Sequence, residues 1–229
     1  MSRQNSQANL ITISNPKSPI SEAYRTLRTN IQFSSVDEPI KVIMIASAQA
    51  GEGKTTTVTN LAITYAMEGK RVLLIDADLR KPSLHRMFEL SNRIGLTNLL
   101  AGQFHLTEVE QATLVDNLTV ISSGPVPPNP SELLGSQKMK QLLSELKNQY
   151  DMILIDTPPN LAVPDGMIIS ANCDGVVLVV QSGKVKRDLV RKAKANLDHV
   201  NARILGVVLN NVERKQTEGY YYYYYGSKE

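Results

Sequence analysis

Six short runs of aliphatic and β-branched residues alternate with segments of helical periodicity along most of this 229-residue chain. Near-continuous apolar character is typical of parallel strands buried on both faces, and right-handed crossovers join such strands through helices. The pattern therefore predicts an α/β fold in which a mostly parallel sheet is covered by helices on both faces. The expected strands are 41–46, 71–76, 118–121, 151–156, 175–180 and 204–210.

Apolar residues at helical spacing predict four helices. One spans 18–33 and docks on an apolar surface, and a second follows the first strand and ends at Gly69, a typical C′ residue. A third carries the apolar residues of 139–146 and is expected to begin beside Asn129, which has the sequence context of an N-cap. The last spans 189–200.

The segment AQAGEGKT, residues 48–55, joins the first strand to its helix. Gly51 and Gly53 allow backbone N–H groups to turn toward phosphates, Lys54 supplies a charge for the β and γ oxygens, and the Thr55 hydroxyl can ligate Mg²⁺. The chain is thus predicted to have a P-loop NTPase-like core that binds ATP with Mg²⁺. The expected nucleotide-binding residues of the loop are Ala50, Gly51, Glu52, Gly53, Lys54, Thr55 and Thr56.

Two further segments place carboxylates at strand ends. LLIDADLR carries Asp76 and Asp78, and ILIDTPP carries Asp156. In a parallel sheet these ends lie on one edge, where ligands bind. Three carboxylates beside a triphosphate repel one another unless a cation intervenes, so the set predicts Mg²⁺.

These motifs resemble the Walker A, A′ and B motifs of the bacterial protein-tyrosine kinases. The resemblance covers nearly the whole chain, and it is to the stand-alone cytoplasmic type from capsular and exopolysaccharide operons. It implies autophosphorylation of the C-terminal tyrosines, with Asp76 as catalytic base, Lys54 stabilising the transferred group, and Asp78 and Asp156 holding Mg²⁺. The residues alone leave the roles of Asp76 and Asp78 open.

The resemblance also implies partners. A transmembrane adaptor of the polysaccharide copolymerase type would activate the kinase at the inner face of the plasma membrane, and a protein-tyrosine phosphatase and other protein substrates would act with it. Glu22, Arg25 and Arg28 match an element used for ring-like self-association, although they could equally be solvated pairs within one helix. Asn210 is where related P-loop folds read adenine.

The C-terminus holds six of the twelve aromatic residues of the chain. A tyrosine phenol with a pKa near ~10 must give its proton to a base as it accepts a phosphoryl group. The candidate acceptors are Tyr220, Tyr221, Tyr222, Tyr223, Tyr224 and Tyr225. We expect an arm and oligomerisation helix in 1–40, a kinase core in 41–211 and a flexible tail in 212–229.

Composition excludes other classes of protein. There are 25 Lys and Arg against 22 Asp and Glu, a balance too even to indicate nucleic-acid binding, although six cations gather between Lys184 and Lys194. The single cysteine, Cys173, excludes an internal disulfide, and three scattered histidines do not predict zinc. No signal peptide or membrane-spanning run is recognisable, so a cytoplasmic location is expected.

Two alternatives remain. A dimerising ATPase of the chromosome-partition and division-site-selection class shares the fold and motifs, but that class carries a signature lysine where this chain has Gln49, and it lacks a tyrosine tail. A non-catalytic scaffold switched by nucleotide is the other, and the intact Lys54, Asp76, Asp78 and Asp156 argue against it.

Overall fold

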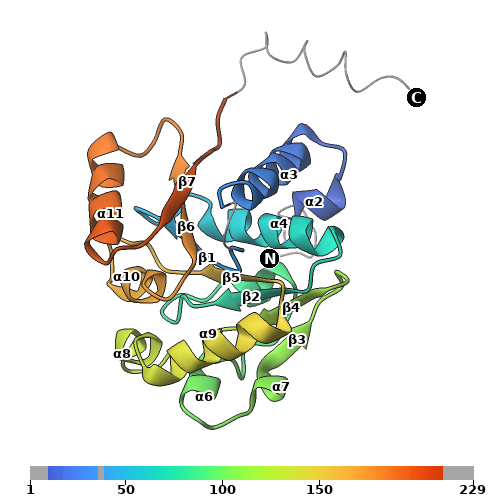
Figure 1. The fold of residues 1–229 in the computed structure, drawn as a ribbon, viewed down its shortest axis with the longest axis vertical. Helices are drawn as coiled ribbons and strands as arrows, with labels where there is room; N and C mark the ends of the chain where they lie inside the picture. The colour runs from blue at the N-terminus through green and yellow to red at the C-terminus, as the bar shows by residue number, and fades with distance from the viewer. Residues whose placement is uncertain (1–9, 36–38, 214–229) are drawn as a thin grey trace.

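The computed structural model describes residues 10–35 and 39–213. These residues form a seven-stranded sheet with helices on both faces (Figure 1). The strands are β1 (Val42–Ser47), β2 (Val72–Asp76), β3 (Glu110–Ala112), β4 (Leu118–Ile121), β5 (Met152–Asp156), β6 (Gly175–Gln181) and β7 (Ile204–Asn210). The helices are α2 (Ile11–Ser14), α3 (Pro19–Gln32), α4 (Lys54–Met67), α5 (Leu84–Met87), α6 (Leu96–Leu100), α7 (Leu106–Val109), α8 (Pro130–Leu134), α9 (Gln137–Gln149), α10 (Asp165–Ser170) and α11 (Arg187–His199).

The strand order is β3-β4-β2-β5-β1-β6-β7, and every neighbouring pair is parallel except β3 with β4. This confirms the predicted α/β fold and all six expected strands. The sequence pattern does not predict β3, because Glu110, Gln111 and Ala112 form no apolar run. As a three-residue edge strand, β3 buries little, and tertiary pairing with β4 rather than propensity produces it.

Side chains of each central strand alternate between two apolar layers. In β1, Met44 packs on the side of α6, α8, α9 and α11, whereas Ile43 and Ile45 pack on the side of α3 and α4. Figure 1 shows these two groups of helices on opposite faces of the sheet. Burial of each such side chain stabilises the fold by about 1.5–3 kcal/mol, which explains why apolar runs located the strands well.

The four predicted helices correspond to α3, α4, α8 with α9, and α11, whereas the short helices α2, α5, α6, α7 and α10 were not predicted. The helix after β1 begins at Lys54 and ends as expected, with Gly69 at a left-handed φ of +83°. The helix expected to begin beside Asn129 is two helices, because the chain breaks at Gly135 and Ser136 accepts a hydrogen bond from the Met139 N–H to cap α9. The Asn129 side chain makes no cap and instead donates to Glu132.

The parallel arrangement brings the carboxyl ends of β1, β2, β5, β6 and β7 to one edge of the sheet. That edge contains the residues that the sequence singles out for nucleotide chemistry. Among the described residues, no helix is long and apolar enough to cross a membrane.

Candidate nucleotide and phosphotransfer site

The P-loop is held in shape before any ligand arrives. Gly51 and Gly53 adopt φ values of +81° and +91°, a region in which glycine is not strained. The Glu52 carboxylate is buried and accepts hydrogen bonds from the backbone N–H groups of Gln49 and of Gln181, the latter at 3.3 Å. The side chain of Glu52 therefore ties the loop to the end of β6, a long-range role that its position in the motif does not reveal.

Asn210 lies against the same loop. Its Nδ2 donates to the Glu52 carbonyl oxygen at 2.9 Å, and a Cβ at residue 53 would collide with this amide. Gly53 is thus required both by its backbone conformation and by the close approach of β7. The contact brings Asn210 to the nucleotide edge, as expected, and gives its side chain a loop contact that the sequence does not predict.

Lys54 and Thr55 both reach Asp156 from the start of α4. Lys54 Nζ lies 3.8 Å from Asp156 Oδ1, and Thr55 Oγ1 donates to Asp156 Oδ2 at 2.6 Å. Burial raises the pKa of Asp156, while the Lys54 charge and the Thr55 hydrogen bond act in the opposite direction. Among the described residues, Oδ1 of this buried carboxylate has no hydrogen-bond partner. An unpartnered oxygen beside a hydroxyl is suited to a hard cation.

Asp76 and Asp156 are direct neighbours, because they pair in register on β2 and β5. Burial raises the pKa of Asp76 to about 7, and the negative charges of Asp156 and Asp78 act in the same direction. Hydrogen bonds from the Leu84 and Ser83 N–H groups to Oδ2, at 2.9 and 3.0 Å, oppose the increase. Asp76 is thus a carboxylate poised to exchange a proton near neutral pH.

Asp78 occupies a different environment. Strand β2 ends at Asp76, so the two side chains are not simply alternate residues of one strand. The half-buried Asp78 carboxylate accepts from the backbone N–H groups of Lys81 at 2.9 Å and Arg80 at 3.3 Å, which forms a turn after the strand. Its own N–H donates to Asp76 Oδ1 at 3.2 Å.

Sequence reasoning missed an ion pair between the partly exposed Arg80 of this turn and a buried carboxylate. Arg80 donates from Nε and a terminal nitrogen to the two oxygens of the fully buried Asp165, at 2.8 and 3.1 Å. Ser131 Oγ donates to the same carboxylate at 2.6 Å. The pair fixes the turn containing Asp78 to the start of α10. The position of Arg80, directly after the acidic motif, was the one available signal.

In the described part of the chain, no three His, Cys, Asp or Glu side chains are arranged to hold a metal ion by themselves. Mg²⁺ commonly binds through one or two carboxylates together with substrate phosphates and water. The oxygens of Thr55 and Asp156 fit that mode of binding, in which the ligand completes the coordination.

The other predicted residues do not meet at this site. Arg25 pairs with Glu22 at 2.7 Å on the surface of α3, and Arg28 donates to the Thr64 carbonyl oxygen of α4 at 2.8 Å. The expected acceptors 220–225 lie outside the described residues, as does most of the predicted tail.

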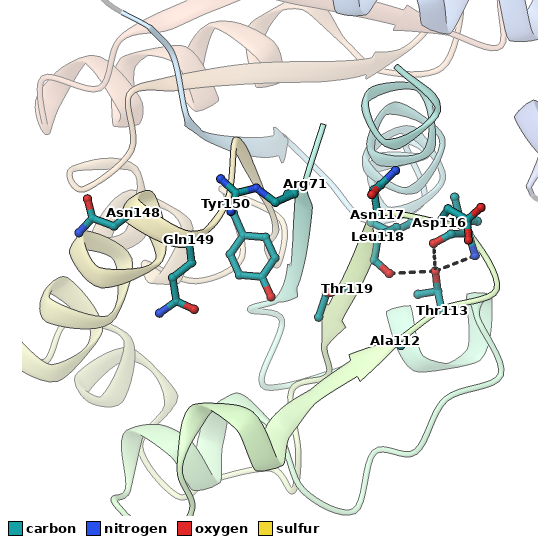
Figure 2. A pocket seen from close by; sticks show the side chains of 11 residues that line it. Arg71, Ala112, Thr113, Asp116, Asn117, Leu118, Thr119, Asn148, Gln149 and Tyr150 are labelled. Carbon is teal, nitrogen blue, oxygen red and sulfur yellow. Dashed lines mark hydrogen bonds between the residues drawn. The ribbon is translucent and has the colours of Figure 1, made fainter. Parts of the chain in front are cut away.

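A separate cavity of 710 Å³ opens at the opposite ends of the strands (Figure 2). It is lined by Arg71, Tyr150 and residues from 112–119, and Tyr150 donates from its hydroxyl to Glu110 at 2.7 Å. Figure 2 also shows Thr113, whose hydroxyl donates to the Leu118 carbonyl oxygen at 3.0 Å. Because the cavity shares no residue with the P-loop edge, it is not the nucleotide site.

Comparison with known proteins identifies the family. A family model described as an AAA domain matches residues 40–204. Tyrosine-protein kinase YwqD of Bacillus subtilis is 48% identical over 217 residues, which cover 94% of this chain and 92% of that protein. Putative tyrosine-protein kinase CapB of Staphylococcus aureus is 41% identical, with 90% of each chain covered. This chain belongs to the bacterial tyrosine-protein kinase family.

Solved structures agree with this membership. The crystal structure of the chimerical protein CapA2B2 matches this tyrosine-protein kinase with a TM-score of 0.87 and 40% identity, covering 90% of this chain and 91% of that one. The cell division ATPase MinD of Pyrococcus furiosus matches with a TM-score of 0.65 and 28% identity, covering 77% and 74%. The kinase therefore shares its P-loop fold with the cell division ATPase MinD, and its fold and family imply that it binds nucleotide.

Proposed function

We propose that this tyrosine-protein kinase transfers the γ-phosphoryl group of ATP to its own C-terminal tyrosines, Tyr220 to Tyr225. The observation that carries the proposal is the pairing of Asp76 with Asp156 beside the P-loop. Because burial and the neighbouring charge raise the pKa of Asp76 to about 7, this carboxylate matches the requirement for a base that works near neutral pH.

Each side chain at the site has a proposed role. Lys54 binds the β and γ phosphate oxygens and compensates charge as it is transferred, and Asp76 accepts the phenolic proton. Thr55 and Asp156 hold Mg²⁺, with Asp78 as a further ligand directly or through water. The bound ion would neutralise phosphate charge during transfer. The backbone of 50–56 surrounds the phosphates, and Asn210 stands next to that loop for contact with the base.

The reach of the C-terminal segment supports self-phosphorylation. The contact of Asn210 with Glu52 shows that β7 ends at the P-loop. From Asn211 to Tyr222 is eleven residues, which at ~3.3 Å each span roughly 36 Å when extended. Tyrosines of the cluster therefore reach the site of their own chain or that of a neighbouring copy.

The biological setting follows from the family. We propose a role in capsule or exopolysaccharide biosynthesis, in which a transmembrane adaptor recruits the kinase to the inner face of the plasma membrane and activates it. A protein-tyrosine phosphatase would reverse the modification. Glu22, which is exposed on α3, and the half-buried Arg25 are proposed to contribute to self-association, whereas Arg28 also anchors α3 to α4.

The test is incubation of the chain with Mg²⁺ and ATP, followed by mass spectrometry of the C-terminal peptide. We expect phosphate on one or more of Tyr220 to Tyr225, an increase when an adaptor fragment is added, and none in Lys54→Met. Loss of a general base typically costs about 10²–10⁴-fold, which is the expected effect of Asp76→Asn.

Other outcomes would favour the alternatives. ADP release without phosphotyrosine would indicate an ATPase of the partition type, whose fold this chain shares. Nucleotide binding without either product would indicate a nucleotide-switched scaffold.

A further inference from the structure

The strongest concentration of charge in the molecule lies on and before α11. The cationic surface of α11 consists of Lys184, Lys186, Arg187, Arg191, Lys192 and Lys194, all of which are exposed. Between Lys184 and Lys194 these six cations are accompanied by one acid, Asp188, so this short segment carries a net charge of +5. Because the whole chain carries +3, the remaining residues are net negative. The positive charge of this protein is therefore local.

Little of this charge is neutralised inside the chain. Arg191 pairs with Asp188 at 3.4 Å and Lys194 with Asp198 at 2.6 Å, and both pairs are exposed to solvent, where such pairs contribute little. Within residues 10–35 and 39–213, no carboxylate lies within ion-pair distance of Lys186, Arg187 or Lys192. The surface retains donors for an external anion.

The cationic surface begins where the C-terminal segment leaves the sheet. Gln181 of β6 pairs with Asn210 of β7, and the Ser182 N–H donates to the Asn210 carbonyl oxygen at 2.9 Å. With the Gln181 amide oriented to satisfy its neighbours, its oxygen accepts from Lys184 Nζ at 3.2 Å and from Asn211 Nδ2 at 3.1 Å. Its nitrogen then donates to the Gly51 carbonyl oxygen at 3.3 Å. Gln181 thus contacts the P-loop, the first lysine of the cationic surface and the residue at which the C-terminal segment leaves β7.

The segment that follows has a charge that phosphorylation reverses. Residues 214–229 contain three cations and two acids, so their side chains give a net charge of +1. The cationic surface does not attract such a segment. Each phosphotyrosine adds about −1.5 to −2 charges and three acceptor oxygens, so a single modification makes the segment anionic. Lysine and arginine side chains form strong hydrogen bonds with phosphate.

The C-terminal segment is long enough for its tyrosines to reach every part of α11. The nine residues from Asn211 to Tyr220 span up to ~30 Å when extended. Helix α11 has 13 residues and is therefore about 20 Å long. Because the segment is attached next to the surface, its effective concentration there is on the order of millimolar.

We propose that the cationic surface of α11 binds the C-terminal segment 214–229 once its tyrosines are phosphorylated. The inference rests on the proposed function only for the source of the phosphate. Docking removes the modified segment from the P-loop edge, so that the site is free for another tyrosine. The interaction depends on phosphate and weakens as salt screens it.

The test measures binding of a labelled synthetic peptide of residues 214–229 to the dephosphorylated full chain by fluorescence anisotropy. One peptide carries phosphate on Tyr220, Tyr222 and Tyr224, and its twin carries none. We expect the phosphopeptide to bind at least about tenfold more tightly at about 50 mM salt, and to lose about tenfold or more at about 500 mM. The variant Lys186→Gln/Arg187→Gln/Lys192→Gln should weaken binding by about tenfold or more.

A matched control removes equal charge elsewhere. Lys70, Lys138 and Lys140 are exposed and distant in sequence from α11, so Lys70→Gln/Lys138→Gln/Lys140→Gln should change phosphopeptide binding by less than about twofold. Thermal melting of both triple variants verifies that each remains folded. Equal weakening in the two variants, or undiminished binding in the α11 variant, would overturn the proposal.

The same variants distinguish a surface that binds the phosphorylated segment from one that binds anionic lipid. If the α11 variant loses binding to vesicles containing phosphatidylserine but keeps the phosphopeptide, the surface contacts membrane lipid and the proposal is wrong. Because the phosphate is synthetic, this assay gives its answer whether or not the chain phosphorylates itself. Absence of phosphotyrosine after incubation with ATP would refute the proposed function alone.

Discussion

The Asn210 side chain donates a hydrogen bond to the Glu52 carbonyl oxygen at 2.9 Å and thereby occupies the space that a side chain at position 53 would need. The phosphate loop at the start of the core is thus closed by a residue 158 positions later in the chain. The two glycines of the loop differ in this respect, because a Cβ added at Gly51 would meet no atom within 4 Å.

Substitution of these two glycines distinguishes the cost of backbone strain at a positive φ from the cost of a clash with Asn210. Gly51→Ala should cost about 1–2 kcal/mol of unfolding free energy, because alanine is strained at a positive φ. Gly53→Ala should cost about 1–3 kcal/mol more, because its Cβ also meets Asn210. Chemical denaturation measures both, and Asn210→Ala in the Gly53→Ala background should recover part of the difference. Equal costs for the two glycines would show that the Asn210 contact is unimportant.

The raised pKa of Asp76 makes the stability of the fold depend on pH. Folding raises this pKa from 3.8 to about 7, so the native state binds the proton more tightly than the unfolded state. The stabilisation is fully present below pH 3.8 and is lost as pH rises through about 7. Melting temperatures measured between these limits should fall with pH in the wild type and fall less steeply in Asp76→Asn. Parallel slopes would contradict the assignment.

Phosphotransfer should respond to the same titration in the opposite direction. A proton acceptor must be charged to act, so the initial rate should rise with pH up to about 7 and then level off. Bound Mg²⁺ shifts this midpoint downward, because a nearby cation favours the carboxylate. Rates at saturating Mg²⁺ and ATP across this range give the profile. A flat profile would mean that Asp76 does not accept the proton in the rate-limiting step.

The Arg80 and Asp165 pair should be worth more than an ion pair on the surface. Arg80→Ala leaves a fully buried carboxylate without its cation, and because Arg80 is itself partly exposed we expect a loss of about 2–4 kcal/mol. Arg191→Ala breaks an exposed pair of the same type and should cost less than about 1 kcal/mol. Urea denaturation of Arg80→Ala, Asp165→Ala and the double variant gives the coupling energy. Additive losses would show that the two side chains act independently.

The hydroxyl of Thr55 should matter specifically for the metal ion. Thr55→Ser keeps the hydrogen bond to Asp156, whereas Thr55→Val removes both that bond and the candidate Mg²⁺ ligand. We expect the concentration of Mg²⁺ needed for half-maximal nucleotide binding to rise about tenfold or more in Thr55→Val and to change little in Thr55→Ser. Calorimetric titration of nucleotide at several Mg²⁺ concentrations checks this. An unchanged requirement in Thr55→Val would exclude the hydroxyl as a ligand.

Features that depend on nearby residues were predictable from the sequence. The apolar runs located all six predicted strands, of which five are buried, whereas the edge strand β7 leaves Val207 and Leu209 exposed. The glycines of the P-loop and Gly69 adopt the positive φ values that their positions suggested. Strand β3 was not predictable, because its polar residues gain their structure from pairing with β4. The break at Gly135 was not predicted either. The sequence indicated Asn129 as the N-cap of one long helix, whereas in the structure Ser136 caps a second helix, α9.

Within the site, sequence could place the residues but not their contacts. The motifs pointed to Lys54, Thr55 and the three aspartates, but not to the buried position of Asp76 directly beside Asp156 on β2 and β5, where burial first and the Asp156 charge second raise its pKa. The buried partner of Arg80 lies 85 residues away, and the side chain of Glu52 turns toward Gln181 rather than solvent. Such long-range pairs depend on the folded topology, so a single sequence cannot reveal them.

The position of β5 has a consequence for synthesis of the protein. In the sheet β5 lies between β1 and β2, which do not touch each other directly. While Met152–Asp156 is still inside the ribosome exit tunnel, the emerged chain already contains the P-loop and Asp76. It lacks the strand that pairs with both β1 and β2. Nucleotide should therefore protect only those translation intermediates in which this strand has emerged from the exit tunnel.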